Sequence, residues 1–305
     1  MDKLIFIVGP TATGKSEIAL TLAAQINAEI VSCDSMLLYR EPVIITNKPS
    51  VAMRAQVPHH FIDVISVEDT YNAFSYYQQA TEYIDKLYER GVPVIVCGGT
   101  GLYAQTLLDG IFGGVSADPE LRQQLAKEAE TKGSIFLHAK LKEVDSLSAE
   151  KISPNDTKRI IRALEVYYRT GVPISCKQKE RKGLWGRVPL VIFGITLPRD
   201  MLYERINTRV EQMFEQGAVE EVRQLRTLAL SLTAQKIIGI KEIGAYLCGD
   251  AGLEEAKELM KKNTRNFAKR QNTWFRKDKR INWIDVGEKD PTAVTEEVLR
   301  QCMKQ

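Results

Sequence analysis

A run of residues that could bind phosphate lies near the start of the chain: Gly9-Pro10-Thr11-Ala12-Thr13-Gly14-Lys15-Ser16. The run fits the pattern G-x-x-x-x-G-K-[ST] and follows the apolar stretch Leu4–Val8. Its glycines let the backbone curl so that N–H groups face inward, and Lys15 adds a positive charge for the outer phosphate. The hydroxyl of Ser16 is suited to Mg²⁺. We therefore predict that the chain handles a phosphorylated small molecule, the alternative being a plain glycine turn between a strand and a helix.

Asp34 follows a second apolar strand, predicted over residues 30–33. Ligands in open α/β sheets bind beyond the carboxyl ends of the strands, so we expect Asp34 near the phosphate-binding run. Its carboxylate could hold a metal-bound water or accept a proton from an attacking nucleophile, and the spacing does not decide between these roles. A structural alternative is that Asp34 caps a helix through Ser35.

A third apolar strand, predicted over residues 92–97, is followed by Gly98-Gly99-Thr100-Gly101. An ATPase with this kind of phosphate loop is expected to carry an acidic Mg²⁺ ligand there, and this chain has Thr100 instead. A hydroxyl can bond to a leaving phosphate oxygen, but it activates water poorly. The guanine-reading pattern N-K-x-D is absent too, because Asn47-Lys48-Pro49-Ser50 lacks the aspartate. Hydrolysis of ATP or GTP is therefore weakly supported, and a simple glycine turn is the alternative.

Positive charge is concentrated near the end of a chain whose formal net charge is only +3, since residues 261–280 hold nine Lys or Arg and one acid. Helical spacing puts the cations and the large apolar side chains of this stretch on opposite faces: Lys262, Arg265, Lys269 and Arg276 against Met260, Phe267 and Trp274. We expect the aromatic side chains in the core. The cationic face is suited to a nucleic-acid backbone, the alternative being a face that is only solvated. A second cationic cluster is Lys158, Arg159 and Arg162, although pairing of Arg162 with Glu165 is a structural alternative.

The composition is that of a globular protein, with 305 residues of which 44% are hydrophobic and 27% charged, and this length suggests about two domains. No signal peptide is recognised, and no apolar run approaches the roughly 20 residues of a membrane span. The five cysteines lack C-x-x-C spacing, so neither a disulfide framework nor a zinc site is indicated. We expect His59 and His60 in a loop rather than at a metal site. A location in the reducing cytoplasm fits these features.

The order of apolar and helical segments predicts an α/β fold, with a parallel sheet flanked by helices. Strands are predicted over residues 4–8, 30–33, 92–97 and 190–195. Helices are predicted from residue 15 onward and over residues 76–88, 156–170, 200–216, 218–230 and 254–276. Charged helical patterns replace strand patterns from residue 117 to residue 184. We therefore expect a core domain of residues 1–114 and 189–305, interrupted by an α-helical insertion domain of residues 115–188.

Several segments together resemble the tRNA dimethylallyltransferase family, also called tRNA isopentenyltransferases, over nearly the whole chain. They are residues 9–16, Asp34-Ser35-Met36, residues 57–63, residues 98–103, residues 155–165 and residues 268–276. The resemblance implies a P-loop NTPase-like core that transfers a dimethylallyl group from dimethylallyl diphosphate to a tRNA adenosine. The acceptor atom would be N6 of the adenosine on the 3′ side of the anticodon, in tRNAs that read codons starting with U. It also implies a monomer that works away from membranes, with Mg²⁺ as cofactor and the anticodon stem-loop of tRNA as partner.

The resemblance implies roles for individual residues. Asp34 would accept a hydrogen bond and then a proton from the adenine amino group, and Thr100 would contact the oxygen that joins the prenyl carbon to the diphosphate. Residues 9–16 would grip the diphosphate, with Ser16 on Mg²⁺ and with Arg205 and Arg209 as further clamp candidates. The implied tRNA contacts are Asp34, Ser35, Met36, Leu37, Thr100, Arg122, Lys158, Arg159, Arg162, Lys236, Lys241, Lys269, Arg270, Gln271 and Arg276.

Two departures from the family pattern follow Asp34. Leu37 stands where the family often has Gln, and residues 41–49 replace the usual Gly-Met-Asp-Ile-Gly-Thr-Ala-Lys-Pro, keeping only some of it. Loss of two glycines would stiffen or reshape that loop. Two alternatives are a P-loop small-molecule kinase, which predicts ATP turnover, and a catalytically inactive tRNA-binding relative, which predicts tRNA binding without product.

Overall fold

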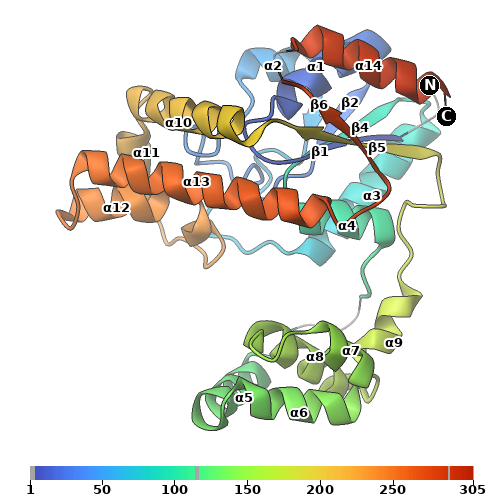
Figure 1. Cartoon of the computed structure of the whole chain (residues 1–305), viewed down its shortest axis with the longest axis vertical. Coiled ribbons are helices and arrows are strands. Elements are labelled where there is room, and N and C mark those ends of the chain that lie inside the picture. Colours follow the sequence, from blue (N-terminus) through green and yellow to red (C-terminus); the bar gives the residue numbers. More distant parts are fainter. Residues whose placement is uncertain (1–3, 114–116, 288, 305) are drawn as a thin grey trace. The chain divides into compact units, whose positions relative to one another are not determined.

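The computed structural model describes residues 4–113, 117–287 and 289–304, and the chain divides into two compact units (Figure 1). The first unit is Met1–Leu108 with Leu184–Gln305, and the second is Asp109–Gly183. The expected boundary at residues 114 and 115 lies outside the described residues. The core domain was expected to resume at residue 189, but the first unit resumes at Leu184. The reason is that the amides of Leu184 and Trp185 donate to the carbonyls of Leu107 and Leu108 at 2.8 and 2.9 Å.

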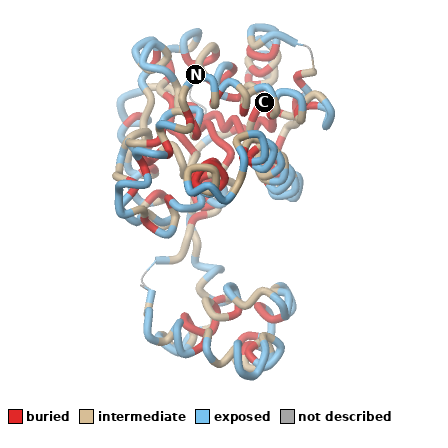
Figure 2. The backbone as a smooth tube through the Cα atoms, turned by 90° about the vertical axis from the view of Figure 1, so that its left-hand side faces the viewer, coloured by how far each residue is buried: buried red, intermediate tan, exposed pale blue. Residues whose placement is uncertain are grey.

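The first unit is built on a parallel sheet with strand order β3-β2-β4-β1-β5-β6. The strands are β1 (Leu4–Val8), β2 (Glu29–Ser32), β3 (His59–His60), β4 (Val94–Gly98), β5 (Leu190–Thr196) and β6 (Ile281–Asp285). Successive side chains of a strand point to opposite faces. Ile5 and Ile7 of β1 therefore enter one core while Phe6 and Val8 enter another. The strand residues are largely buried, and Figure 2 shows buried backbone gathered in the middle of this unit.

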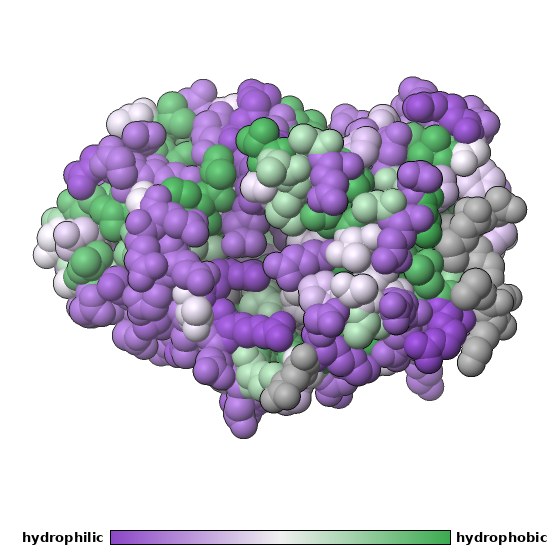
Figure 3. Space-filling view, turned by 90° about the horizontal axis from the view of Figure 1, so that it is seen from above, coloured by the Kyte–Doolittle hydropathy of each residue, from purple (hydrophilic) through white to green (hydrophobic). Residues whose placement is uncertain are grey.

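Helices cover both faces of the sheet (Figure 1). On the face of Ile5 lie α1 (Lys15–Ile26) and α14 (Pro291–Lys304), and on the other lie α3 (Ala73–Glu89) and α4 (Gly101–Asp109). A further apolar cluster joins α10 (Arg199–Glu215), α11 (Ala218–Leu225), α12 (Ile240–Cys248) and α13 (Leu253–Phe275). Two short helices complete this unit, α2 (Val51–Gln56) and η2 (Ala234–Lys236). Hydrophilic side chains cover much of the face seen in Figure 3.

The predicted α/β class is confirmed, but several sequence predictions in this unit are wrong. His59 and His60 form an edge strand, because His59 pairs with Ile30 of β2 and the His60 ring lies 2.6 Å from the Glu29 carboxylate. Residues 281–285 and 291–304 form β6 and α14, where neither was expected. Helix α11 ends at Leu225 rather than residue 230, because the following chain turns toward Val67, whose carbonyl accepts from the amide of Ser231.

The second unit is helical and has an apolar core of its own. Its elements are α5 (Pro119–Lys132), α6 (Ser134–Val144), α7 (Ser146–Lys151), α8 (Thr157–Thr170), α9 (Ile174–Lys177) and η1 (Gln178–Glu180). Asp118 and Asp156 cap α5 and α8 by accepting from the amides of Leu121 and Arg159. These caps satisfy amides that the first turn of a helix leaves unpaired.

A buried carboxylate joins α5 to α8 in the second unit. Glu165 is fully buried and accepts from Nε and Nη2 of Arg122 at 2.8 and 2.9 Å, from Nη1 of Arg162 at 2.6 Å, and from the amide of Asp118 at 2.8 Å. Burial alone raises the pKa of Glu165, but the hydrogen bonds from these partners outweigh it and hold the pKa at about 2. The pairing of Arg162 with Glu165 that the sequence left open is therefore present.

We predict that Glu165→Gln lowers the free energy of unfolding at pH 7 by about 1–3 kcal/mol, since charge-assisted hydrogen bonds to arginine are weakened. The folded pKa of about 2 lies below the ordinary value of 4.5. The carboxylate therefore stabilises the fold above that value, and this contribution is lost as the pH falls toward 2. Urea unfolding of the full chain at several pH values measures the difference. The exposed Glu82→Gln is the control, and an equal Glu165→Gln deficit at pH 7 and pH 3 would contradict the assignment.

Candidate functional site

Three loops leave the same edge of the sheet. The parallel register pairs Val8 of β1 with Gly98 of β4, and Ser32 of β2 with Cys97 of β4. The loops that follow these strands therefore begin side by side, at the carboxyl edge where α/β sheets bind ligands. The amide of Thr100 donates to the carbonyl of Cys33 at 3.1 Å, which joins two of these loops directly.

The phosphate-binding run forms a loop between β1 and α1 whose shape depends on glycine. Gly9 has a φ of 138°, and a side chain there would collide with the backbone carbonyl of Ile195. Gly14 has a left-handed φ of 85° and is the N-cap of α1. Ala12 is also left-handed, with a φ of 65°. These conformations turn the loop directly into the N-terminus of α1, whose positive end attracts anions.

Lys15 is the buried cation of this loop. Its side chain folds back so that Nζ donates to the carbonyl of Pro10. Burial removes the water that stabilises the ammonium group and lowers the pKa of Lys15 from 10.5 to about 8, although the nearby Asp34 carboxylate opposes the shift. Ser16 is exposed and lines the same polar cavity as Lys15 and Asp34.

Asp34 and Thr100 lie at the ends of β2 and β4. Oδ1 of Asp34 accepts from the amide of Met36 at 2.9 Å, and residues 35–38 form a turn, so Asp34 does not cap a helix. Burial raises the pKa of Asp34, while the Met36 amide and the Lys15 ammonium oppose the rise. A carboxylate with a raised pKa is a better proton acceptor. Oγ1 of Thr100 accepts from the amide of Ser35 at 3.0 Å, which fixes the backbone beside Asp34.

Two adjoining cavities meet at Asp34. A polar cavity of about 300 Å³ contains Lys15 and Ser16, and a more apolar cavity of about 490 Å³ contains Thr100. Seven residues line both: Thr11, Asp34, Thr46, Asn47, Gly99, Arg209 and Gln271. The apolar part is formed by Met36, Ile45, Val210, Met213, Ile237, Ile238, Met260, Phe267 and Trp274. A molecule with a charged phosphate end and a small apolar end fits this pair of cavities.

Phe267 and Trp274 of α13 were expected in the core, and that prediction is wrong for both. Trp274 is 38% exposed and Phe267 is half-buried, and both line the apolar cavity. The buried face of α13 includes Ala268 and Phe275 instead. Trp274 lies so close to Gly101 that a side chain at residue 101 would collide with the indole ring. Glycine at this position was the available signal for the close approach.

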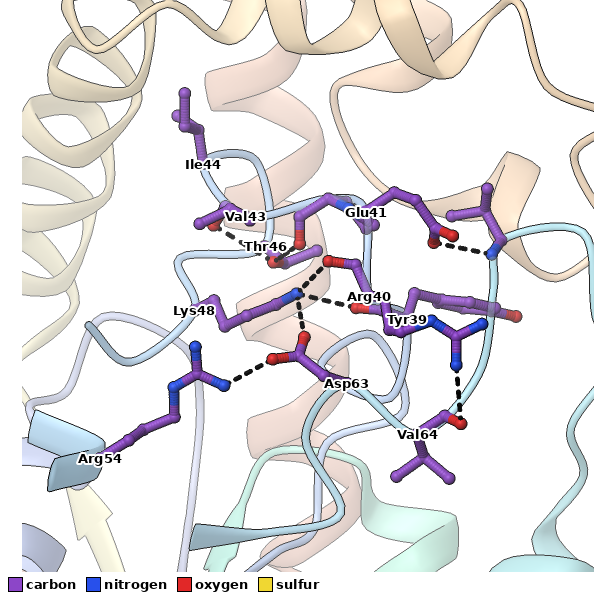
Figure 4. A network of polar contacts seen from close by, with 12 residues as sticks. Tyr39, Arg40, Glu41, Val43, Ile44, Thr46, Lys48, Arg54, Asp63 and Val64 are labelled. Atoms are coloured by element: carbon purple, nitrogen blue, oxygen red, sulfur yellow. Dashed lines mark hydrogen bonds and ion pairs between the residues drawn. The ribbon is translucent and has the colours of Figure 1, made fainter. Parts of the chain in front are cut away.

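The loop that departs from the family pattern forms part of the wall of both cavities. Figure 4 shows how it is held: the ammonium of Lys48, only 1% exposed, donates to the carbonyls of Tyr39 and Arg40 at 2.8 Å and to Asp63 at 2.6 Å. Arg54 pairs with the same Asp63 carboxylate (Figure 4). A buried ammonium with three oxygen partners fixes the backbone around it.

Two further carboxylates fix the same loop, one from α11 and one from the loop itself. Glu221 of α11 accepts from the consecutive amides of Val43, Ile44 and Ile45 at 2.7, 2.7 and 2.9 Å. Glu41 accepts from the amide of Val67 at 2.9 Å (Figure 4). The side chain of Ile45, which stands where the family pattern has glycine, is thereby directed into the wall of the apolar cavity.

The two arginine candidates for binding phosphate differ in position. Arg209 of α10 lines both cavities, and its Nη1 lies 3.4 Å from Oγ1 of Thr11. Arg205, one turn earlier, is exposed and donates to the carbonyl of Gly287 at 3.4 Å. Of the two, Arg209 is the one placed beside the phosphate loop.

The residues expected to contact tRNA lie in different parts of the structure. Ser35, Met36, Lys236 and Arg270 line the apolar cavity, and Leu37 lines the polar one. Lys269 and Arg276 line a third cavity of about 350 Å³, and Lys241 is exposed on α12. Arg265 of the expected cationic face instead donates to Oδ1 of Asn207 at 2.6 Å. The remaining residues belong to the second unit: Arg122, Lys158, Arg159 and Arg162.

Within residues 4–113, 117–287 and 289–304, no group of three or more His, Cys, Asp or Glu side chains could hold a metal ion. Over the same residues, no helix has the length and apolar character needed to span a membrane.

The chain is similar in sequence to known proteins that all belong to one family. Residues 37–278 match the family model described as IPP transferase. The tRNA dimethylallyltransferase of Carboxydothermus hydrogenoformans is 43% identical over 99% of this chain and 97% of its own length, and that of Geobacter sulfurreducens is 44% identical over 93% and 92%.

The chain is also similar to solved structures of proteins with the same kind of name. The full-length tRNA isopentenylpyrophosphate transferase of Bacillus halodurans is 36% identical, with a TM-score of 0.73 over 100% of this chain and 96% of that one. A eukaryotic dimethylallyltransferase acting on tRNA is 30% identical, with a TM-score of 0.80 over 93% of this chain and 74% of that one.

We predict that the affinity for inorganic diphosphate with Mg²⁺ falls as the pH rises above about 8, the pKa of Lys15. Bound diphosphate needs the ammonium form, so above this pKa binding must take up a proton and weakens by up to about tenfold per pH unit. Calorimetric titrations between pH 7 and pH 9.5 measure the effect. Lys15→Arg is the control, because its guanidinium stays charged. Identical pH dependence of the two proteins would contradict the assignment to Lys15.

Proposed function

The chain belongs to the IPP transferase family, and from that premise we propose that it is a tRNA dimethylallyltransferase. The reaction moves the dimethylallyl group of dimethylallyl diphosphate to N6 of the adenosine on the 3′ side of the anticodon, in tRNAs that read codons starting with U. Diphosphate is the second product.

The observation that carries this proposal is the meeting of a polar and an apolar cavity at Asp34. Dimethylallyl diphosphate has a charged end and a five-carbon apolar end, and the bond that breaks lies between them. With the diphosphate against Lys15 and Ser16, the reacting carbon comes to the junction of the cavities. Phe267 and Trp274 provide flat surfaces in the apolar cavity against which a base can stack.

The transfer requires one proton acceptor and one stabilised leaving group. N6 of adenine forms a bond to the first carbon of the dimethylallyl group as the bond from that carbon to the diphosphate oxygen breaks. Asp34, with its raised pKa, accepts the proton that N6 loses. Lys15 and Arg209 balance the charge that accumulates on diphosphate, and Thr100 bonds to the bridging oxygen. Water need not be activated, which agrees with the lack of an acidic residue at the end of β4.

We propose Mg²⁺ as the divalent cation of the reaction. The hydroxyl of Ser16 and the diphosphate oxygens are hard oxygen donors of the kind that Mg²⁺ prefers, and Ser16 is exposed in the polar cavity. When bound, the ion supplies positive charge beside the diphosphate oxygens.

The tRNA is proposed to contact cations of both units. Lys262, Lys269 and Arg270 are exposed on α13, and Arg276 is exposed directly after it. Lys158 and Arg159 are exposed at the start of α8. Adenine must leave the anticodon stack to reach Asp34, at a cost of a few kcal/mol that backbone contacts offset. Cys33, Cys97, Cys176 and Cys248 are free thiols, which supports a proposed location in the reducing cytoplasm.

The proposed function predicts prenylated adenosine when the protein is incubated with dimethylallyl diphosphate, Mg²⁺ and an unmodified tRNA of the expected class. Mass spectrometry of the digested RNA detects the product. Asp34→Asn preserves the shape of the side chain but cannot take the proton, so the rate falls by about 10²–10⁴-fold. The absence of product from the unaltered protein would contradict the proposal. Turnover of ATP would then favour a kinase, and tRNA binding alone would favour an inactive relative.

Charge reversal on α13 tests the proposed tRNA surface. Lys269→Glu should weaken binding of the anticodon stem-loop. The negative slope of log affinity against log salt concentration should become shallower by about 1. Filter binding over a range of salt concentrations measures both quantities. Lys86→Glu on α3, where Lys86 pairs with Glu82 at the surface, is the control and should change little. Equal effects of the two variants would exclude a specific contact at Lys269.

A further inference from the structure

One buried side chain connects α13 to two of the three loops of the site. Gln271 is 5% exposed, and its Oε1 accepts from the amide of Thr11 in the phosphate loop at 2.8 Å. Its Nε2 donates to the carbonyl of Gly99, beside Thr100, at 3.0 Å. A single amide group thus satisfies a donor on one loop and an acceptor on the other.

The surroundings of Gln271 leave its side chain little freedom. A side chain at Gly99 would collide with the Gln271 amide, so glycine there makes room for it. Helix α13 is held on either side of Gln271, because Ala268 belongs to one core of the sheet and Phe275 to the other. The bridge therefore connects two loops to a helix that is itself firmly packed.

The residues that Gln271 holds lie at the junction of the two cavities. Thr11, Gly99 and Gln271 line both the polar and the apolar cavity, as Asp34 does. A shift of either loop would alter the distance between the phosphate loop and Thr100. The neighbours of Gln271 in sequence, Lys269 and Arg270, are exposed.

We propose that Gln271 is a positioning residue that sets the phosphate loop relative to the Thr100 loop. This inference rests on the proposed transfer reaction. It assigns Gln271 to the diphosphate side of the reaction rather than to direct contact with tRNA. It also makes the helix with the proposed tRNA-binding cations part of the frame that holds the diphosphate.

The chemistry of the amide makes the proposal specific. Gln has a donor and an acceptor at the end of one side chain. Met has a similar length and neither function, so Gln271→Met leaves Thr11 and Gly99 unbridged. Ionised Glu accepts from Thr11 but faces the Gly99 carbonyl without a proton to donate. Protonated Glu has one donor and one acceptor and restores both bonds.

The test is calorimetric binding of inorganic diphosphate with Mg²⁺, together with steady-state prenylation of an anticodon stem-loop. We expect Gln271→Met to weaken diphosphate binding about tenfold and to lower kcat, with the affinity for the stem-loop within about twofold of the unaltered protein. Gln271→Glu should resemble the Met variant at pH 8. Relative to the unaltered protein at each pH, its diphosphate affinity should recover as the pH falls toward 5.5.

A matched control is Asn263→Leu, which removes another side-chain amide of α13, one that donates to Glu242 at 2.6 Å. It should leave diphosphate affinity unchanged. Equal effects of Gln271→Met and Asn263→Leu would overturn the proposal, as would a Gln271→Glu deficit that does not depend on pH. Failure of the unaltered protein to prenylate RNA would instead contradict the proposed function, while the diphosphate comparison would still decide the positioning of the loop.

Discussion

The parallel register of β1, β4 and β2 is the constraint on which the site depends. Val8 is level with Gly98, and Ser32 is level with Cys97, so three loops start from one edge of the sheet. Each loop contributes one feature: a phosphate-binding sequence pattern from the first, a carboxylate from the second and a hydroxyl from the third. A change of register between any two strands would separate these groups, even if each loop kept its own shape.

Burial gives the site its electrostatic character. Removing Lys15 from water lowers its pKa to about 8, and removing Asp34 from water raises its pKa. Each charged form would therefore be stabilised by a substrate: the ammonium by the negative charge of diphosphate, and the carboxylate by a hydrogen-bond donor such as an amino group. In the proposed reaction, the apolar cavity beside them keeps the reacting carbon away from bulk water, which favours transfer over hydrolysis.

Local patterns were enough to predict the phosphate loop, the positions of Asp34 and Thr100 after their strands, and the α/β class. They failed where the structure depends on contacts between distant segments. Residues 281–285 form a strand because they pair with β5, and Trp274 lies outside the core because it packs on Gly101. The bridge made by Gln271 spans 260 residues to Thr11, a distance over which no periodicity extends. The sequence revealed that residues 41–49 depart from the usual loop. It did not reveal that the carboxylate of Glu221 holds this loop.

The most direct test of the proposed chemistry is a crystal structure of the protein with Mg²⁺, an anticodon stem-loop and a dimethylallyl diphosphate analogue whose bridging oxygen is sulfur. The diphosphate is expected in the loop of residues 9–16, the dimethylallyl group in the apolar cavity, and the adenine amino group within hydrogen-bond distance of Asp34. Diphosphate bound outside that loop, or an adenine amino group beyond the reach of Asp34, would contradict the central claim that transfer takes place where the two cavities meet.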